Sequence, residues 1–312
     1  MEVRVLVGVQ SARGTAETSN MYRLASTDFG MSPTVDKTTS EALGSGRWER
    51  DGFVSKIAVE GDLPVEAIRE QLELLFYGAG FDGVADLVDP DKWVISPSSA
   101  TKNWLTVGMD DIDNNMFEYS KDCLISSIGI STSIGAYVTA TASMIGMDFT
   151  TNSTGYTGIE IAPAGEPLIC LGTTIKQAGT DITSKVESID ITIDNKLEGK
   201  QSLNSEYYKA IRQGERGSVG ISMTFNEFDK PTYIQDLSDI KSNSSYEIIT
   251  EFAERKNPAK IFRMTFPNCK VTKSERTDIG GAGGLTKEVS AYYDETEKTP
   301  VKIEILDYAS IL

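Results

Sequence analysis

Short runs in which apolar and polar residues alternate recur along most of this chain of 312 residues. Clear examples are 53–60, 188–194, 219–225 and 302–305, where Val, Ile, Met or Phe alternates with Ser, Thr, Asp, Glu or Lys. Because successive side chains of a strand point to opposite faces, each run predicts a strand with one buried and one solvated face. The alternation therefore predicts a mainly β protein.

Two segments have a helical pattern instead. Residues 65–77, which follow Pro64, carry apolar side chains at spacings of three and four, and we expect this helix to cover a sheet. A second and more polar helix is predicted over 232–240, after Pro231. Helices are thus few, and each follows a predicted strand.

The order of these features is repeated along the chain, which predicts a duplication. A strand-like segment, a polar stretch ending in Glu-Arg, a second strand and a Pro-started helix occur in both halves, about 162 to 166 residues apart. The first copy is expected at 1–150 and the second at 165–312. Residues 151–164, rich in Gly and Thr, are the predicted linker.

Composition excludes several classes of function. The chain has no His and a net charge of −16, so imidazole catalysis, most zinc sites and dedicated nucleic-acid binding are disfavoured. Its three cysteines, Cys123, Cys170 and Cys269, form no CxxC motif and indicate a reducing compartment. The first ten residues lack a signal-peptide pattern, so the sequence predicts a soluble, non-secreted protein with no membrane segment.

No motif predicts a catalytic, cofactor-binding or metal site. Asp190 and Asp194 share a strand face but lie ~13 Å apart at ~3.3 Å per residue, wider than the ~5–9.5 Å of glycosidase carboxylates. The glycine-rich segment 280–284 lacks the Lys-Ser/Thr of a phosphate loop and is expected to be a hairpin tip. We therefore predict a protein that is not an enzyme and needs no cofactor.

Several segments, taken in order, resemble phage tail tube proteins, the major tail proteins of siphovirus-type bacteriophages with long, non-contractile tails. Besides the order of strands and helices described above, the segments that carry the resemblance are 47–50, 59–64, 117–123, 138–146 and 172–197. The resemblance implies two tandem tail-tube-type modules, each a β-sandwich or partial barrel with a flanking α-helix.

The same resemblance implies a structural role in the virion tail. Subunits would assemble in the bacterial host cytoplasm into stacked rings whose strands close around one lumen, the conduit for genome ejection. Because this chain has two modules, three copies could complete a pseudo-six-fold ring; a ring of six copies is the alternative. Implied partners are the tape-measure protein, tail-tip and terminator proteins, and double-stranded DNA that passes through without specific binding, with no membrane.

Candidate contact residues follow from the predicted strands and from the long polar stretches 34–51 and 195–217, which we expect to be long ordered loops. The solvated strand positions are candidates for the lumen, and the ends of the polar stretches are candidates for contacts between rings. The lumen candidates are Lys56, Ala58, Glu60, Asp190, Thr192, Asp194, Ser222 and Thr224, and the inter-ring candidates are Glu49, Arg50, Glu215 and Arg216.

Two other classes remain open at this point. A bacterial β-sandwich surface or adhesive protein would share the strand pattern, although we would expect a signal peptide and disulfides in such a protein. A carbohydrate-active enzyme would require a carboxyl group with a raised pKa in a cleft, which a sequence alone does not show.

Overall fold

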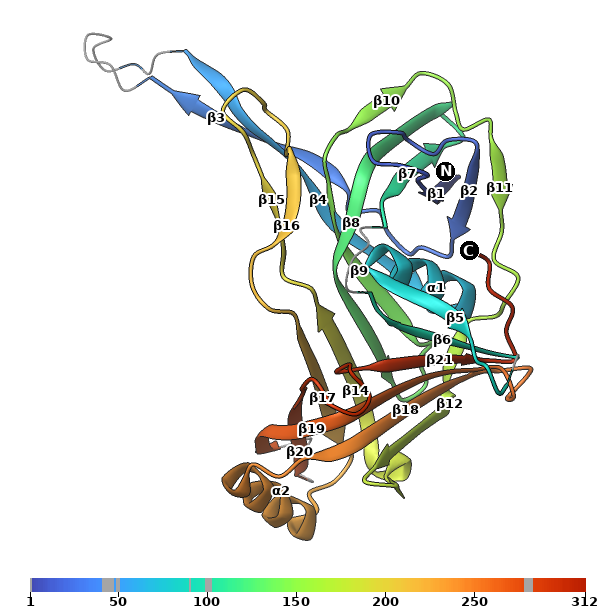
Figure 1. Cartoon of the computed structure of the whole chain (residues 1–312), viewed down its shortest axis with the longest axis vertical. Helices are drawn as coiled ribbons and strands as arrows, with labels where there is room; N and C mark the ends of the chain where they lie inside the picture. Colours follow the sequence, from blue (N-terminus) through green and yellow to red (C-terminus); the bar gives the residue numbers. More distant parts are fainter. Residues whose placement is uncertain (1, 41–47, 49–50, 90, 99–102, 278–282) are drawn as a thin grey trace.

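The computed structural model describes residues 2–40, 48, 51–89, 91–98, 103–277 and 283–312, and strands dominate it (Figure 1). The predicted mainly β fold is confirmed. The elements of the first half are β1 Val3–Val9, β2 Asn20–Leu24, β3 Ser32–Thr39, β4 Gly52–Glu66, α1 Arg69–Gly78, β5 Phe81–Ala85, β6 Lys92–Pro97, β7 Leu105–Asp111, β8 Met116–Ser133, β9 Thr139–Gly146 and β10 Thr150–Asn152.

The elements of the second half follow a short connecting strand. They are β11 Ile159–Ile161, β12 Leu168–Gln177, β13 Thr180–Asp181, the 3-10 turn η1 Thr183–Lys185, β14 Val186–Asp194, β15 Leu197–Lys200, β16 Ala210–Gln213, β17 Ser218–Phe225, α2 Lys230–Ser242, β18 Tyr246–Glu254, β19 Ile261–Thr277, β20 Gly284–Ala291 and β21 Lys302–Leu306. The strands predicted at 53–60, 188–194, 219–225 and 302–305 all lie within these elements.

Two antiparallel ladders with the same connectivity organise the chain. The first runs β1–β7–β8–β9–β4–β3. The second runs β12–β18–β19–β20–β17–β14. In both, the helix connects the fifth strand of the ladder to the segment that leads into the second. The order of pairing is therefore the same in the two halves of the chain.

A bulge with the same local bonds interrupts the third strand of each ladder. In β8 the register shifts between Ile125 and Ser127, and the intervening Ser126 hydroxyl donates to the Ser143 carbonyl oxygen at 3.0 Å. In β19 the shift lies on either side of Thr272, whose hydroxyl donates to the Glu288 carbonyl oxygen at 3.1 Å. A buried cysteine, Cys123 or Cys269, precedes each bulge by three residues. The repeat thus extends to individual bonds.

The two ladders are joined into one sheet. The end of β8 pairs with β14, and β21 pairs with β6 of the first half. Within the predicted linker, β10 pairs with β8 and β11 runs parallel to β2. One hydrophobic core cluster contains residues from both halves, so the boundaries at 150 and 165 remain predictions.

Helix α1 lies in the middle of this shared core. Its Leu72, Leu74, Leu75 and Phe76 side chains are fully buried, as the predicted apolar stripe requires. The predicted start at Val65 is wrong, however, because β4 continues to Glu66. Backbone pairing with β9 keeps these residues extended, and the helix begins only at Arg69.

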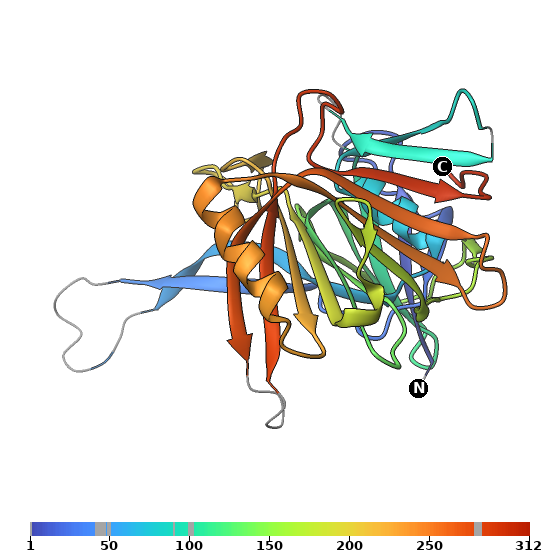
Figure 2. The same ribbon diagram turned by 90° about the horizontal axis from the view of Figure 1, so that it is seen from below.

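Helix α2, which contains the predicted segment 232–240, lies across the strands of the second ladder (Figure 2). Its single buried residue is Asp236, whose carboxylate accepts a hydrogen bond from Lys287 of β20 at 2.6 Å. Lys287 and Asp236 are 0% and 1% exposed, and Ser274 donates to the same carboxylate at 3.0 Å. An ion pair, rather than an apolar stripe, therefore fixes this helix on the sheet.

Both long polar stretches contain strands, so the prediction that they are loops is wrong. Residues 34–39 belong to β3, whose pairing with β4 forms an arm that projects from the body (Figure 1). Residues 197–200 and 210–213 form the β15–β16 hairpin beside it, where the Ile57 amide donates to the Glu206 carbonyl oxygen at 2.8 Å. Polar residues form β3 because this strand is exposed along its whole length, whereas the β15–β16 segment packs Tyr208 and Ile211 against β4.

The glycine-rich segment lies mostly outside the described residues. The strands that flank it, β19 and β20, pair antiparallel up to Thr277 and Gly284. This pairing is the one that a hairpin requires.

The buried ion pair of α2 gives a first prediction. Asp236→Ala leaves the Lys287 ammonium buried without its carboxylate, and we expect a loss of about 3–5 kcal/mol of unfolding free energy. The measurement is urea denaturation of the unassembled subunit. Asp236→Leu combined with Lys287→Met should restore most of the loss, because no charge is then buried. Glu295→Ala, at an exposed ion pair, is the matched control and should cost at most about 1 kcal/mol. A loss no larger than that of the control would contradict the role of the pair.

Candidate functional site

An uninterrupted polar surface extends across β9, β8, β14, β17 and β20. Directly opposed residues of antiparallel strands share a face, so the strand register shows which side chains lie in one row. Asp190 faces Ser131 of β8 on one side and Ser222 of β17 on the other. The row continues to Thr139 in β9 and to Glu288 in β20. We call this surface the polar face.

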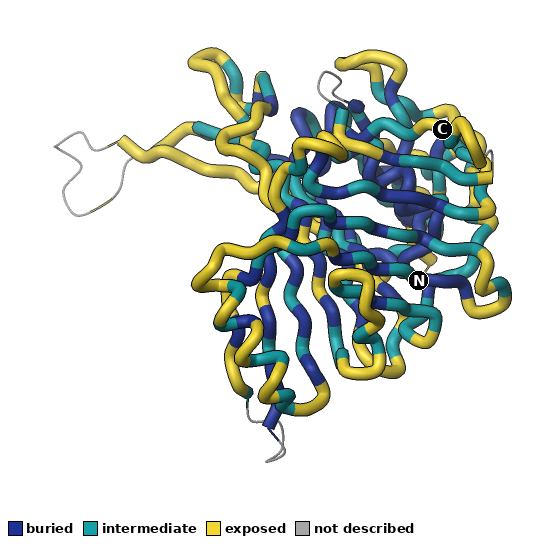
Figure 3. Tube along the Cα trace, turned by 60° about the horizontal axis from the view of Figure 1, so that its bottom comes forward, coloured by how far each residue is buried: buried dark blue, intermediate teal, exposed yellow. Residues whose placement is uncertain are grey.

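The opposite side of the same strands forms the core. Ile189, Ile191 and Ile193 of β14 are at most 4% exposed, while Asp190 and Thr192 between them are exposed. Figure 3 shows this alternation of buried and exposed positions along neighbouring strands. The predicted two-sided strands are therefore observed, and Asp190, Thr192, Asp194, Ser222 and Thr224 lie together on the polar face.

The row that contains Thr192 is shallow. Gly129 and Gly220 face Thr192 from its two neighbouring strands. A Cβ atom added at Gly220 would have no atom within 4 Å, and one at Gly129 would only just reach the Thr141 carbonyl oxygen. The polar face at this row thus consists of backbone and small hydroxyl side chains.

The two aspartates of β14 differ in their surroundings. Partial burial raises the pKa of Asp190 above its usual value, and no ion pair involving Asp190 occurs among the described residues. Asp194 lies 2.5 Å from Lys196, and this hydrogen bond raises the pKa of the lysine. Asp190 is therefore the stronger source of negative potential on the polar face, because a neighbouring cation offsets the charge of Asp194.

Lys56, Ala58 and Glu60 do not join the open rows. The Tyr208 hydroxyl of the β15–β16 segment donates to Glu60 at 2.6 Å, and the Lys56 ammonium lies 5.3 Å from the Tyr208 ring centroid. Ala58 is 8% exposed in a small core cluster with Ile211. The hairpin thus contacts this part of β4 and buries Ala58, while Glu60 stays exposed beside it.

The inter-ring candidates divide into described and undescribed residues. Glu215 and Arg216 are exposed between β16 and β17, at the base of the hairpin. Glu49 and Arg50 lie outside the described residues. More prominent in this region are two apolar side chains that the sequence did not single out, Phe53 at 67% and Leu203 at 111% exposure.

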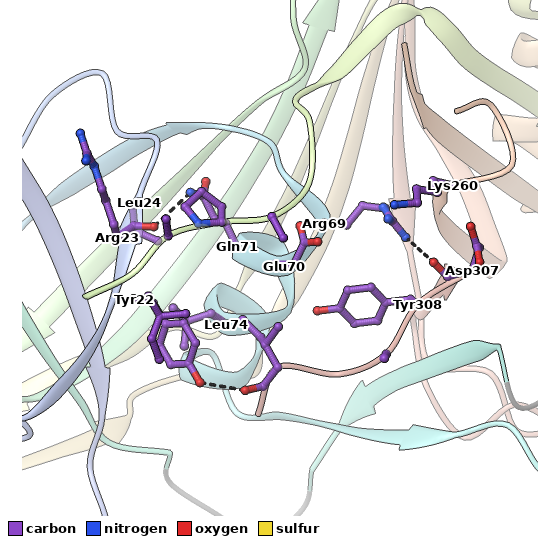
Figure 4. Close-up of a pocket in the computed structure, with 16 residues that line it drawn as sticks. Tyr22, Arg23, Leu24, Arg69, Glu70, Gln71, Leu74, Lys260, Asp307 and Tyr308 are labelled. Carbon is purple, nitrogen blue, oxygen red and sulfur yellow. Dashed lines mark hydrogen bonds between the residues drawn. The ribbon is translucent and has the colours of Figure 1, made fainter. Parts of the chain in front are cut away.

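A separate cavity of about 310 Å³ lies between β2, α1 and the C-terminal segment (Figure 4). The Tyr22 hydroxyl donates to the Ile311 carbonyl oxygen at 2.8 Å, and Arg69 donates to the Asp307 carbonyl oxygen at 3.1 Å. Tyr308 donates to the buried Glu73 carboxylate at 2.6 Å. These bonds hold the C-terminal segment against α1, so the residues around the cavity have a structural task.

Groups of three or more His, Cys, Asp or Glu side chains that could hold a metal ion do not occur in the described part of the chain. None of the described helices is long and apolar enough to cross a membrane. The described residues thus form a broad polar surface and projecting pairs of strands, both of which are accessible to other molecules.

The sequence pattern predicts some, but not all, of the strands that form the polar face. Residues 138–144 alternate in the same way as 188–194, so β9 could have been included among the polar strands. The positions of Ser131 and Glu288 depend on register across strands far apart in sequence, for which no local signal exists.

Comparison with known proteins agrees with this geometry. The family model of phage tail tube proteins matches residues 2–249, which is most of the chain. No curated protein matches at a significant level. Because the family match covers well over half of the sequence and includes both ladders' polar strands up to β18, the chain belongs to the phage tail tube protein family.

Proposed function

We propose that the polar face lines the lumen of a tube through which the phage genome leaves the virion. Membership of the family makes the protein a structural component of the virion tail that assembles with itself into a tube. The observation that supports the lumen assignment is the continuous face of small hydroxyl side chains and acids on the strands from β9 to β20. The tail is of the long, non-contractile siphovirus type, and tape-measure, tail-tip and terminator proteins are the further partners.

The chemistry of the polar face suits passage of DNA. Acidic side chains repel phosphates, and this repulsion acts only within about a Debye length, ~8 Å at physiological salt. Hydroxyl groups on this face offer hydrogen bonds to water, and the glycines add no side chain that could hold a phosphate. Asp190 supplies negative charge without an ion pair among the described residues, whereas Lys196 and Lys273 partly neutralise Asp194 and Glu288.

A charge reversal tests the lumen assignment. Asp190→Lys with Asp194→Lys should leave tubes assembled but slow DNA release several-fold, because lysines in the wall attract phosphates. Release is measured in virions by fluorescence of ejected DNA. Glu295→Lys with Glu297→Lys makes the same charge change in an exposed turn and should leave the rate unchanged. Equal rates for all three virions would move β14 out of the lumen.

Ring composition is a second consequence. We propose three chains per ring, with pseudo-six-fold symmetry, and the two ladders of the same connectivity in each chain support this proposal. Native mass spectrometry of single rings and the symmetry of end-on electron micrographs would count the chains directly. Six chains in one ring would refute the three-fold arrangement.

The β15–β16 hairpin is proposed to contact the adjacent ring. Leu203→Asp changes one fully exposed tip residue, so we expect an unchanged fold and a loss of tube growth. Leu87→Asp, at 102% exposure in the turn between β5 and β6, is the matched control. Tube length is measured by negative-stain electron microscopy, with circular dichroism as the check on folding. Normal tubes from the Leu203 variant would remove the hairpin tip from the contact.

A further inference from the structure

The edges of β3 and of the end of β19 have no partner strand within the described residues. In the internal repeat, these two strands correspond to β14 and β8, which pair with each other. Within the described residues, β3 pairs with no strand other than β4, and residues 270–277 of β19 pair only with β20. In the corresponding places, β14 pairs with β17 and also with β8. The joined edges β8 and β14 are therefore the counterparts of the free edges β19 and β3.

The bulges fix the corresponding positions on β8 and β19. The first paired residue after the bulge is Ser127 in β8 and Lys273 in β19. Two residues further along come Gly129 and Glu275. The second strand of each ladder, β7 or β18, pairs with one edge of β8 or β19 and ends before the bulge. Beyond the bulge, that same edge is the one available for another strand.

The ladder rows fix the positions on β3 and β14. The row through Ser127 crosses β9 and β4 and reaches Gly30, whose amide donates to the Asp62 carbonyl oxygen at 3.0 Å. The row through Lys273 crosses β20 and β17 and reaches Asp190. Ser32 therefore corresponds to Thr192, and Thr34 corresponds to Asp194.

We propose that β3 of one copy pairs antiparallel with residues 273–277 of β19 in a neighbouring copy, in the register of the internal β14–β8 pair. This inference rests on the proposed ring and specifies which edges form it. Inside the chain, Thr192 faces Gly129 and Asp194 faces Ser127. The transferred pairs are Ser32 with Glu275 and Thr34 with Lys273.

Side-chain chemistry agrees with the transferred register. Ser32, Thr34, Lys273 and Glu275 are exposed and lie on the side of their strands that continues the polar face. Met31, which precedes Ser32 and points to the other side of β3, is 4% exposed and belongs to the core. The proposed seam therefore joins polar side chains to polar side chains on this face, and a shift by one residue would turn the side chains of one strand to the other face.

Backbone direction agrees as well, with one bond fewer than in the template. Because the Gly30 amide points to β4, the amides of Met31 and Val35 point to the free edge. The corresponding Asn195 amide of the internal seam donates to the Ser126 carbonyl oxygen at 2.8 Å. Pro33 has no N–H to donate. A proline on an exposed edge hinders unspecific strand pairing before assembly.

Cysteine pairs test the register. Ser32 with Glu275 and Thr34 with Lys273 are pairs without direct backbone bonds, in which side chains approach closely enough for a disulfide. Each pair is introduced into one chain with Cys170→Ser, and assembled tubes are oxidised mildly. Cys123 and Cys269 are buried, and burial raises the pKa of both thiols to about 12, so they remain unreactive.

The swapped pairs provide the matched control. Ser32→Cys with Lys273→Cys, and Thr34→Cys with Glu275→Cys, use the same four positions two residues out of register, where the paired residues are diagonal neighbours ~7–8 Å apart. We expect the in-register variants to form covalent rings about tenfold faster or more on non-reducing gels. Circular dichroism confirms that all variants are folded.

The outcomes separate this inference from the proposed function. One outcome is that the wild-type protein forms tubes while the in-register cysteine variants react no faster than the swapped variants. That result would overturn the β3–β19 seam and leave the tail tube role intact. Wild-type protein that remains monomeric at high concentration would overturn the assembly, and the seam with it.

Discussion

Backbone hydrogen bonding at strand edges is the constraint on which the rest of this structure depends. A sheet exposes unpaired amides and carbonyl oxygens at both edges, and each such edge must be paired, covered or protected. In this chain the edges of β8 and β14 satisfy each other. A closed barrel requires such edge pairing all the way around. Each chain makes one of these pairings internally, between β8 and β14.

The two sides of the sheet divide the remaining work. Their alternation places isoleucine, valine and phenylalanine in a core shared by both halves and leaves hydroxyl and acidic side chains on the polar face. The helices serve this division differently. Helix α1 contributes four fully buried apolar side chains, whereas α2 contributes one buried carboxylate. A buried ion pair fixes orientation more than it stabilises, because desolvation offsets much of its attraction.

Local sequence patterns predicted the strands well and their neighbours poorly. Ile189 to Ile193 showed their buried face through simple alternation, and the leucines of α1 showed theirs through spacing. The start of α1 was missed because β9 holds Val65 and Glu66 in a ladder that only the folded chain reveals. The polar stretches were taken for loops because solvated hairpins carry no apolar alternation. Nothing near Lys56 and Glu60 in sequence indicates the contact that both make with Tyr208.

Duplication within one chain also changes the energetics of closing a ring. When two modules are separate subunits, every seam carries the full loss of translational and rotational freedom. Covalent linkage makes the β8–β14 seam intramolecular, so it forms at the high effective concentration that a linker provides. A ring of six modules built from three such chains then has three seams between molecules instead of six. In the proposed ring, the residues of β3 and β19 would supply only those three seams, which is consistent with an edge strand that includes a proline and is fully exposed in the single subunit.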